Sequence, residues 1–382
     1  MRQPGPGRAG CTRRGALAAL PFASILNAAD KGRVLPTEAR RYLDPATEFP
    51  VDLLTDPAHS SVHPQPYLRS IGRRGTFFLF SSDRGGGYQA YRFELRSGEI
   101  RQLTDAGALA TSALQLLPED RAFAYIDGRV LRAAAFTGLR ERDVYRIPDD
   151  WELGDGFTVA LDGVYAALVE KKGARSRLRL INMARGAATT IAEADGLIKH
   201  PIPRPRRASV LYQRDDGLWL VNYDGQNNQR LCQVNPSPGA ALWSPDGRQV
   251  LYLSGRDRNV ALRERTPDTQ QDRLLAPTSQ FVNFARNADG SVFVGASGNV
   301  GSPYLLILVR AVRRELAIGE HKASDPRSVA PIFSPTSQRI YFQSDRHGKP
   351  AIHSIVLDKF LEKTETETDP EKPDPPSEPK KS

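Results

Sequence analysis

Short stretches in which apolar and polar residues alternate recur along the whole chain, and each is bounded by Gly, Asp, Asn or Pro. The clearest example runs from Ser81 to Asp105, where a GGG turn precedes the alternating segment YQAYRFEL and an SGE turn separates it from IRQLTD. Weaker copies occupy 244–257 and 334–357. A period of two residues predicts antiparallel strands joined by tight turns. Helical periodicity is nearly absent, so the pattern predicts an all-β fold.

The strands repeat at a nearly constant spacing. The apolar residue near the end of each VLY-like strand gives a series whose members lie roughly 40–48 residues apart: Phe80, Tyr125, Leu168, Tyr212, Tyr252, Val294 and Phe342. A propeller blade of four strands takes about 40–50 residues. The series therefore predicts a seven-bladed β-propeller, and six blades with one irregular insertion is the alternative.

The N-terminal segment VDLLTD, 51–56, echoes IRQLTD, 100–105, which is predicted to be an outer strand of the first blade. The last blade otherwise ends near Leu357. We therefore expect 51–56 to supply its outer strand and close the ring, which would cover two sheet edges that could otherwise aggregate. An ordinary leader strand is the alternative.

Two tails flank the repeats and divide the chain into three parts. Residues 1–29 carry Arg13-Arg14 before an apolar run with small residues at its end, which predicts a signal peptide of the twin-arginine type and a periplasmic or secreted protein. The run is too short to span a membrane. The propeller is expected over 43–358. Alternating charge, Thr and Pro predict a disordered tail over 361–382.

The charge balance is moderately basic. The formal net charge is +9, and removing the signal, with four arginines and no acid, would leave +5. Nucleic-acid binding is disfavoured because no basic helix is present. An acidic saccharide is the better partner for a basic face, since arginine pairs with carboxylates at two points. A protein partner stays open, and the oligomeric state is not indicated.

Histidine is scarce in the chain and gives the best candidates for chemistry. His200 precedes Pro201, which predicts an extended backbone at His200, and a neutral imidazole can act as a general base. A loop histidine without a role is the alternative. We expect His63, Tyr67, Arg69 and Arg204 to bind substrate at the same channel mouth. His321 and His347 are expected in solvated turns, and His353 on an exposed edge.

Several stretches together resemble the oligogalacturonate lyases, which are seven-bladed propellers that act on short pectin fragments. The resemblance extends over nearly the whole folded region and rests on 81–105, 176–205, 218–231, 242–254, 286–295 and 332–355. TolB-like propellers share the SPDG and SDR turns, so the order of the motifs is more specific than any one of them.

The resemblance implies a catalytic histidine, an assisting arginine and a manganese ion. His200 matches the family's histidine, although Lys199 replaces the glycine before it, and Arg177 is the nearest match for the arginine, with Arg175 as the alternative. The positions that match the metal ligands are different here: Ala240-Ala241, the region of Asn283, and 325–333, which contains neither His nor Gln. We therefore expect no metal site of the family's type and no cofactor.

These observations leave two alternatives for the function of the chain. The chain is either a lyase that acts on acidic pectin-derived oligosaccharides by β-elimination, with weakened or lost catalysis, or a non-catalytic TolB-like propeller that binds a saccharide or a protein.

Overall fold

The computed structural model describes residue 1 and residues 30–215, 217–233, 241–255, 260–278 and 280–357. The predicted signal peptide, apart from residue 1, and the predicted C-terminal tail lie outside the described residues. Within this range the chain forms β-strands and two 3-10 turns, η1 (Pro118–Asp120) and η2 (Pro326–Ser328). No α-helix occurs in the described part, and so no helix there is long and apolar enough to cross a membrane.

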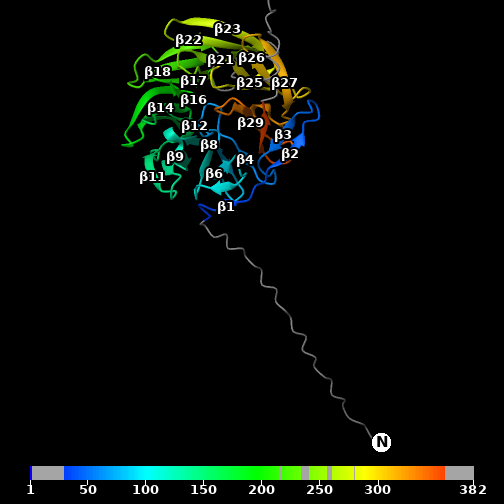
Figure 1. Ribbon diagram of the computed structural model, residues 1–382. Helices are drawn as coiled ribbons and strands as arrows, with labels where there is room; N and C mark the ends of the chain where they lie inside the picture. Colours follow the sequence, from blue (N-terminus) through cyan, green and yellow to red (C-terminus); the bar gives the residue numbers. More distant parts are fainter. Residues whose placement is uncertain (2–29, 216, 234–240, 256–259, 279, 358–382) are drawn as a thin grey trace, which may run out of the picture.

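The strands form six sheets, and Figure 1 shows these sheets following one another around a circle. The first sheet contains β1 (Val34–Leu35), β4 (Ser61–Val62), β5 (Phe77–Ser82), β6 (Gln89–Glu94) and β7 (Ile100–Gln102). The second contains β8 (Leu109–Leu116), β9 (Ala122–Asp127), β10 (Val130–Ala135) and β11 (Glu141–Arg146). The all-β prediction is confirmed in the described residues.

The third sheet has eight strands in two sets of four. The sets are β12 (Glu152–Val159), β13 (Tyr165–Lys172), β14 (Arg175–Asn182), β15 (Ala188–Asp195), and β16 (Ile198–Pro203), β17 (Ser209–Arg214), β18 (Gly217–Asn222), β19 (Gln229–Gln233). One parallel bridge, between Asp155 and Lys199, joins β12 to β16. All other pairings in this sheet are antiparallel, so the two sets are separate meanders that touch at their first strands.

Three further sheets follow along the chain. The fourth sheet contains β20 (Leu242–Trp243), β21 (Val250–Ser254), β22 (Val260–Thr266) and β23 (Gln271–Thr278). The fifth contains β24 (Phe281–Arg286), β25 (Val292–Ser297), β26 (Tyr304–Val309) and β27 (Arg314–Glu320). The last contains β2 (Arg40–Leu43), β3 (Pro50–Leu53), β28 (Ile332–Phe333), β29 (Arg339–Ser344) and β30 (Ala351–Val356). In the last sheet the N-terminal β3 pairs with the C-terminal β30, with Val51 opposite Ile355.

The spaced apolar residues of the sequence repeat occupy equivalent places in the fold. They lie on β5, β9, β13, β17, β21, β25 and β29, each the strand that follows the first strand of a meander. Every one of them is at most 3% exposed: Phe80, Tyr125, Leu168, Tyr212, Tyr252, Val294 and Phe342. The spacing therefore marks the residues that pack between neighbouring sheets, which is where a circular array buries its core.

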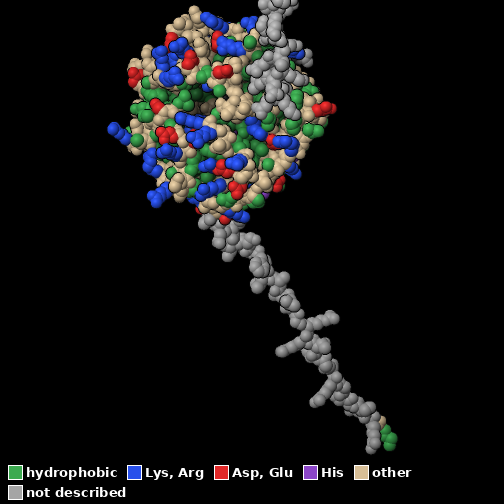
Figure 2. All heavy atoms as spheres, in the orientation of Figure 1, with side chains coloured by type: hydrophobic (Ala, Val, Ile, Leu, Met, Phe, Trp, Pro, Cys, Tyr) green, Lys and Arg blue, Asp and Glu red, His purple; other side chains and the backbone are tan. Residues whose placement is uncertain are grey.

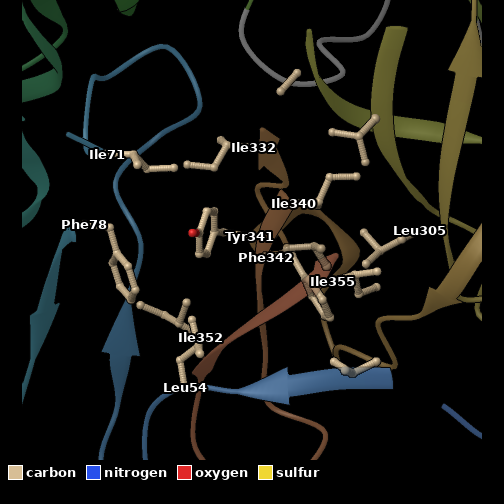
Figure 3. Packing of buried hydrophobic residues seen from close by; sticks show 14 of the residues in the cluster. Leu54, Ile71, Phe78, Leu305, Ile332, Ile340, Tyr341, Phe342, Ile352 and Ile355 are labelled. Carbon is tan, nitrogen blue, oxygen red and sulfur yellow. The ribbon is translucent and has the colours of Figure 1, made fainter. Parts of the chain in front are cut away.

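The largest core cluster spans the junction between the two ends of the chain. Figure 3 shows Leu54, from the N-terminal segment, beside Ile352 of β30, and Phe78 of β5 facing Tyr341 of β29. Phe78 also stacks on Phe93, with ring centroids 5.0 Å apart. The junction is thus packed with large apolar side chains and does not rest on backbone hydrogen bonds alone.

The expectation of an exposed edge position for His353 is wrong. Its side chain is fully buried on β30, stacked on Phe342 with ring centroids 5.1 Å apart, and its Nδ1 lies 3.2 Å from the Tyr42 hydroxyl. The physical reason is the pairing of β3 with β30, since β30 then lies inside its sheet and not at its edge. Burial lowers the pKa of His353 to about 3.

This buried imidazole predicts acid sensitivity. The folded protein keeps His353 neutral, whereas the unfolded chain takes up a proton near pH 6.5. Its contribution is fully present above that pH and is lost as the pH falls towards 3. At pH 5 we expect the free energy of unfolding to fall by about 2 kcal/mol from this group. Denaturant unfolding of the wild type and His353→Phe at pH 7 and pH 5 measures it. An equal loss in both proteins would contradict the assignment.

Candidate functional site in the central channel

The first strands of the meanders surround one cavity of about 410 Å³. Its lining comes from the ends of these strands, including Gln115 of β8, Val159 of β12, Pro203 of β16, Trp243 of β20, Arg286 of β24 and Phe333 of β28. The loop 66–71 completes the lining. Figure 2 shows a face of the ring that is hollowed near its middle, with hydrophobic side chains around the hollow.

Side chains join the first strands to one another around this cavity. The Gln115 amide donates to the carbonyl of Val159 (2.8 Å) and accepts from its N–H (2.9 Å), which connects β8 to β12. The Trp243 indole donates to the carbonyl of Ile202 (3.1 Å), which connects β20 to β16. Arg286 Nε donates to the carbonyl of Trp243 (2.8 Å), which connects β24 to β20. The cavity wall is therefore held in place by its own polar side chains.

His200 lies near the start of β16, whereas the residues of β16 that line the cavity, Ile202 and Pro203, lie at its end. The expectation of an extended backbone is wrong, because His200 has a φ of +47°. The cause is an irregularity in the pairing of β16 with β17 between Lys199 and Ile202, and such a bulge re-aims a side chain next to a site. The neighbouring strand must approach closely: a Cβ on Gly156, with φ +142°, would lie 2.2 Å from Pro201 Cδ.

The His200 imidazole faces the Tyr67 hydroxyl. Its Nδ1 lies 3.3 Å from the hydroxyl oxygen, and the two rings meet edge to face. Burial lowers the pKa of His200, while Asp155 opposes that shift. Burial also raises the pKa of Tyr67. At neutral pH the pair is therefore a neutral imidazole that can accept a proton and a hydroxyl that can donate one.

The other predicted substrate-binding residues are held by internal partners. His63 is buried, with Nδ1 2.8 Å from the carbonyl of Pro64 and Nε2 3.3 Å from the hydroxyl of Ser70, and burial lowers its pKa to about 4. Arg69 lines the cavity and pairs with Asp120 at 2.7 Å. The structure therefore brings Tyr67, Arg69 and His200 to the cavity and its border, with His63 behind them.

Arg204 and Arg177 lie in different surroundings. Arg204 is buried behind Trp243, pairs with Asp268 through two 3.0 Å hydrogen bonds, and lies over the indole ring at 5.1 Å. Arg177 lies on β14, two strands from the channel, where its Nε is 2.6 Å from Glu170 Oε2. The predicted roles of both arginines stay predictions.

The solvated position expected for His321 is also wrong. His321 is fully buried, with its Nε2 3.0 Å from the carbonyl of Ser297 and its Nδ1 accepting from the N–H of Ala323. Both ring nitrogens therefore hold backbone groups. His347, in contrast, is exposed in its turn, where its ring meets Tyr42 edge to face.

The residues present do not fit the manganese site that the resemblance implies. Among the described residues, no three His, Cys, Asp or Glu side chains come together as metal ligands. Ala241 is buried just before β20, and the Asn283 amide donates to the carbonyls of Pro326 and Arg327. A transition-metal site needs imidazole, thiolate or carboxylate donors. The described residues therefore do not supply the ligand set of such a site.

Trp243 and Arg286 are lining residues that the sequence analysis did not single out. Each is the last residue of its strand and precedes a similar turn, WSPDG and RNADG, and Phe333 precedes FSPTS in the same way. Aligning the repeats on these turns is a signal that could have found them, because equivalent strand ends of a circular array face a common axis.

Comparisons with known proteins agree with the fold. Residues 29–173 match the model of the oligogalacturonate lyase family. An oligogalacturonide lyase of Pectobacterium atrosepticum is 26% identical over 377 residues, covering 85% of this chain and 97% of that protein. A solved oligogalacturonate lyase in complex with manganese superposes with a TM-score of 0.81 at 24% identity, over 87% of this chain and 99% of that one.

A further solved structure supports the architecture alone. The β-propeller domain of Cps50 (Swd1) from Myceliophteria thermophila has a TM-score of 0.55 at 13% identity, and it covers 77% of this chain and 97% of that one. The chain is therefore similar to oligogalacturonate lyases, in its residues 29–173 by the family model and over 85% of its length by the curated relative.

Proposed function

We propose that this chain is an exported, seven-bladed propeller that binds short acidic pectin fragments at its channel, with β-elimination that is weakened or lost. The similarity to oligogalacturonate lyases and the shared propeller fold support the substrate class. Seven meanders, two of them joined in the eight-stranded sheet, support the blade count. The twin-arginine-like start of the sequence supports export.

The contact between His200 and Tyr67 is the observation that supports residual lyase activity. β-Elimination removes the proton from C5 of a galacturonate, the C5 electron pair forms the C4–C5 double bond, and the C4–O bond breaks with its electron pair going to the leaving oxygen, which is then protonated. A neutral His200 can take the C5 proton on Nε2, because burial keeps its pKa below the usual value. Tyr67, whose hydroxyl lies 3.3 Å from His200 Nδ1, can orient the ring by accepting a hydrogen bond from Nδ1–H, which leaves the lone pair on Nε2.

Weakened catalysis follows from the charge that the reaction develops. Removing the C5 proton places negative charge next to the substrate carboxylate, and that charge must be stabilised. The described residues lack the imidazole-rich set that the resemblance implies, whereas arginines at the channel can pair with the carboxylate. We therefore expect slow turnover in place of the family's full rate.

The test is incubation with digalacturonate, with and without manganese, while the ultraviolet absorbance of the unsaturated product is followed. In His200→Ala we expect turnover to fall by about 10²–10⁴-fold, the usual loss for a general base. Its melting temperature should stay near that of the wild type. His59→Ala is the control, because this half-exposed histidine lies in the loop before β4 and outside the cavity lining.

The outcomes separate the candidate functions. Slow product formation that depends on His200 supports the lyase. Saturable, salt-sensitive heat with digalacturonate but no product supports a saccharide-binding module. If neither product formation nor binding is detected, the proposal is contradicted. That outcome would favour a propeller without a role in pectin-fragment recognition.

A further inference from the structure

A second pocket lies between the first and the last sheet, next to the central cavity. Its volume is about 250 Å³, and no Asp or Glu is among the described residues that line it. We call it the seam pocket, and its lining includes Arg74, Thr336, Gln338, Arg339 and Tyr341. Arg74 lies in the turn before β5, whereas Arg339 and Tyr341 lie on β29. Segments of both sheets therefore contribute to its wall.

Two guanidinium groups give the seam pocket an excess of positive charge. Arg74 is exposed and makes no ion pair within the described part of the chain. Nη1 of Arg339 donates to Asp52 Oδ2 at 2.9 Å and to the hydroxyl of Ser354 at 2.8 Å, while its Nε and Nη2 donate to none of the described residues. Asp52 also accepts from Arg41 Nε at 2.7 Å. One carboxylate is thus shared by two arginines, and Arg339 is only partly neutralised.

The third donor of the seam pocket is a buried phenol. Tyr341 is 2% exposed, and its hydroxyl makes no hydrogen bond with any described residue. Figure 3 shows the hydroxyl oxygen on the side of the ring towards Phe78 of the first sheet, whose ring centroid is 5.5 Å away. Burial raises the pKa of Tyr341 to about 12, so the hydroxyl keeps its proton and can donate it. A buried tyrosine hydroxyl usually has a partner, and here a ligand can supply it.

We propose that the seam pocket binds a tetrahedral oxyanion, a phosphate or sulfate group, through Arg74, Arg339 and the Tyr341 hydroxyl. A phosphoryl group carries about 1.5–2 negative charges at pH 7 and three acceptor oxygens. Two guanidinium groups and a hydroxyl match that charge and that number of oxygens, whereas a carboxylate has one charge and two oxygens. The volume of about 250 Å³ is below the range of about 300–1,000 Å³ typical of larger ligands. The bound anion would join the first sheet to the last, and the inference does not rest on the proposed lyase reaction.

The test is calorimetry of the full chain with inorganic phosphate, sulfate and glucose 6-phosphate, with glucose as the neutral counterpart and acetate as the carboxylate. We expect saturable binding of phosphate and sulfate that weakens with added salt. Acetate should bind about tenfold more weakly, because it offers fewer charge-assisted hydrogen bonds, and glucose should not bind. Saturating phosphate should also raise the melting temperature by about 2–4 °C, because the anion binds only the folded chain.

Three variants assign the binding to the seam pocket. In Arg74→Gln the Kd for phosphate should rise about tenfold, and in Tyr341→Phe, which removes only the hydroxyl, about threefold. Arg73→Gln is the matched control, because it removes the same charge from the adjacent exposed residue, which lies outside the pocket lining. Its Kd should stay unchanged. Arg74→Gln should also leave the binding of digalacturonate unchanged, which separates this pocket from the site proposed in the channel.

The results also identify the source of the anion. Tighter binding of glucose 6-phosphate than of phosphate would support the proposal with a phosphorylated sugar as the ligand, and equal binding would support it with the free anion. No binding of phosphate or sulfate would overturn the proposal, as would an unchanged Kd in both Arg74→Gln and Tyr341→Phe. Equal affinity for acetate and phosphate would overturn the preference for a tetrahedral group.

Discussion

A chain that starts at Asp56 is expected to lose its stable, soluble monomeric form. The truncation removes β3, the N-terminal strand that pairs with the C-terminal β30. It also removes Val51, Leu53 and Leu54, which are at most 5% exposed. Burying such a side chain contributes about 1.5–3 kcal/mol. The three together approach the whole stability of a typical domain, about 5–15 kcal/mol.

The loss of backbone pairing adds a second hazard. Without β3, this edge of β30 has no partner strand, and such open edges promote association between chains. The measurement is size-exclusion chromatography with thermal unfolding. A chain that starts at Pro36 is the matched control, because β1, a two-residue strand with an exposed Val34, is the one described strand that it removes. A monomer with an unchanged melting temperature after the longer truncation would show that the N-terminal segment is dispensable.

The amino-acid sequence predicted the all-β architecture because each structural repeat has the same pattern of hydrophobic residues. Strand residues such as Tyr125 and Tyr252 recur at a fixed interval, and each repeat buries them in the same way. The all-β fold follows from that regularity, and the resemblance to oligogalacturonate lyases follows from the order of the motifs. The same pattern does not specify how deep a strand lies in its sheet, which is why His353 was expected at an edge and is instead fully buried.

The site was less predictable because it depends on which polar side chains already form hydrogen bonds or ion pairs with residues distant in the sequence. His200 and Tyr67 were both singled out, and the structure brings them into contact. Arg204 was also singled out, but it forms a two-point ion pair with Asp268, which local sequence patterns do not predict. Arg286 was overlooked because its place in the cavity lining follows from its position at a strand end, which emerges only when the repeats are aligned on their turns.

The second large effect is expected at Glu170, a carboxylate with no exposed surface. Its Oε2 lies 2.6 Å from Arg177 Nε and 3.9 Å from Arg179 Nε, and its Oε1 accepts from the Tyr145 hydroxyl at 2.7 Å. Arg177 also lies over the Trp151 ring at 3.9 Å. The cluster joins β11, β13 and β14 through groups that are costly to leave unpaired.

Glu170→Gln keeps the shape of the side chain but leaves two arginines without their shared counter-charge. Breaking a buried pair in this way typically costs about 3–5 kcal/mol. Denaturant unfolding measures this loss. Glu193→Gln is the matched control, since its half-exposed carboxylate pairs with Arg175 on the same sheet, and a surface pair contributes about 0–1 kcal/mol.

The same pair of variants bears on the predicted role of Arg177. A guanidinium held between Glu170 and Trp151 is positioned by the protein itself, so its removal should lower stability whether or not the enzyme turns over. If Arg177 assists catalysis as the family resemblance implies, Arg177→Lys should lose turnover beyond what its stability loss explains, whereas Glu193→Gln should change neither. A stable Glu170→Gln protein, within about 1 kcal/mol of the wild type, would contradict the structural part of this prediction, because it would mean that the two arginines find other partners or water at no cost.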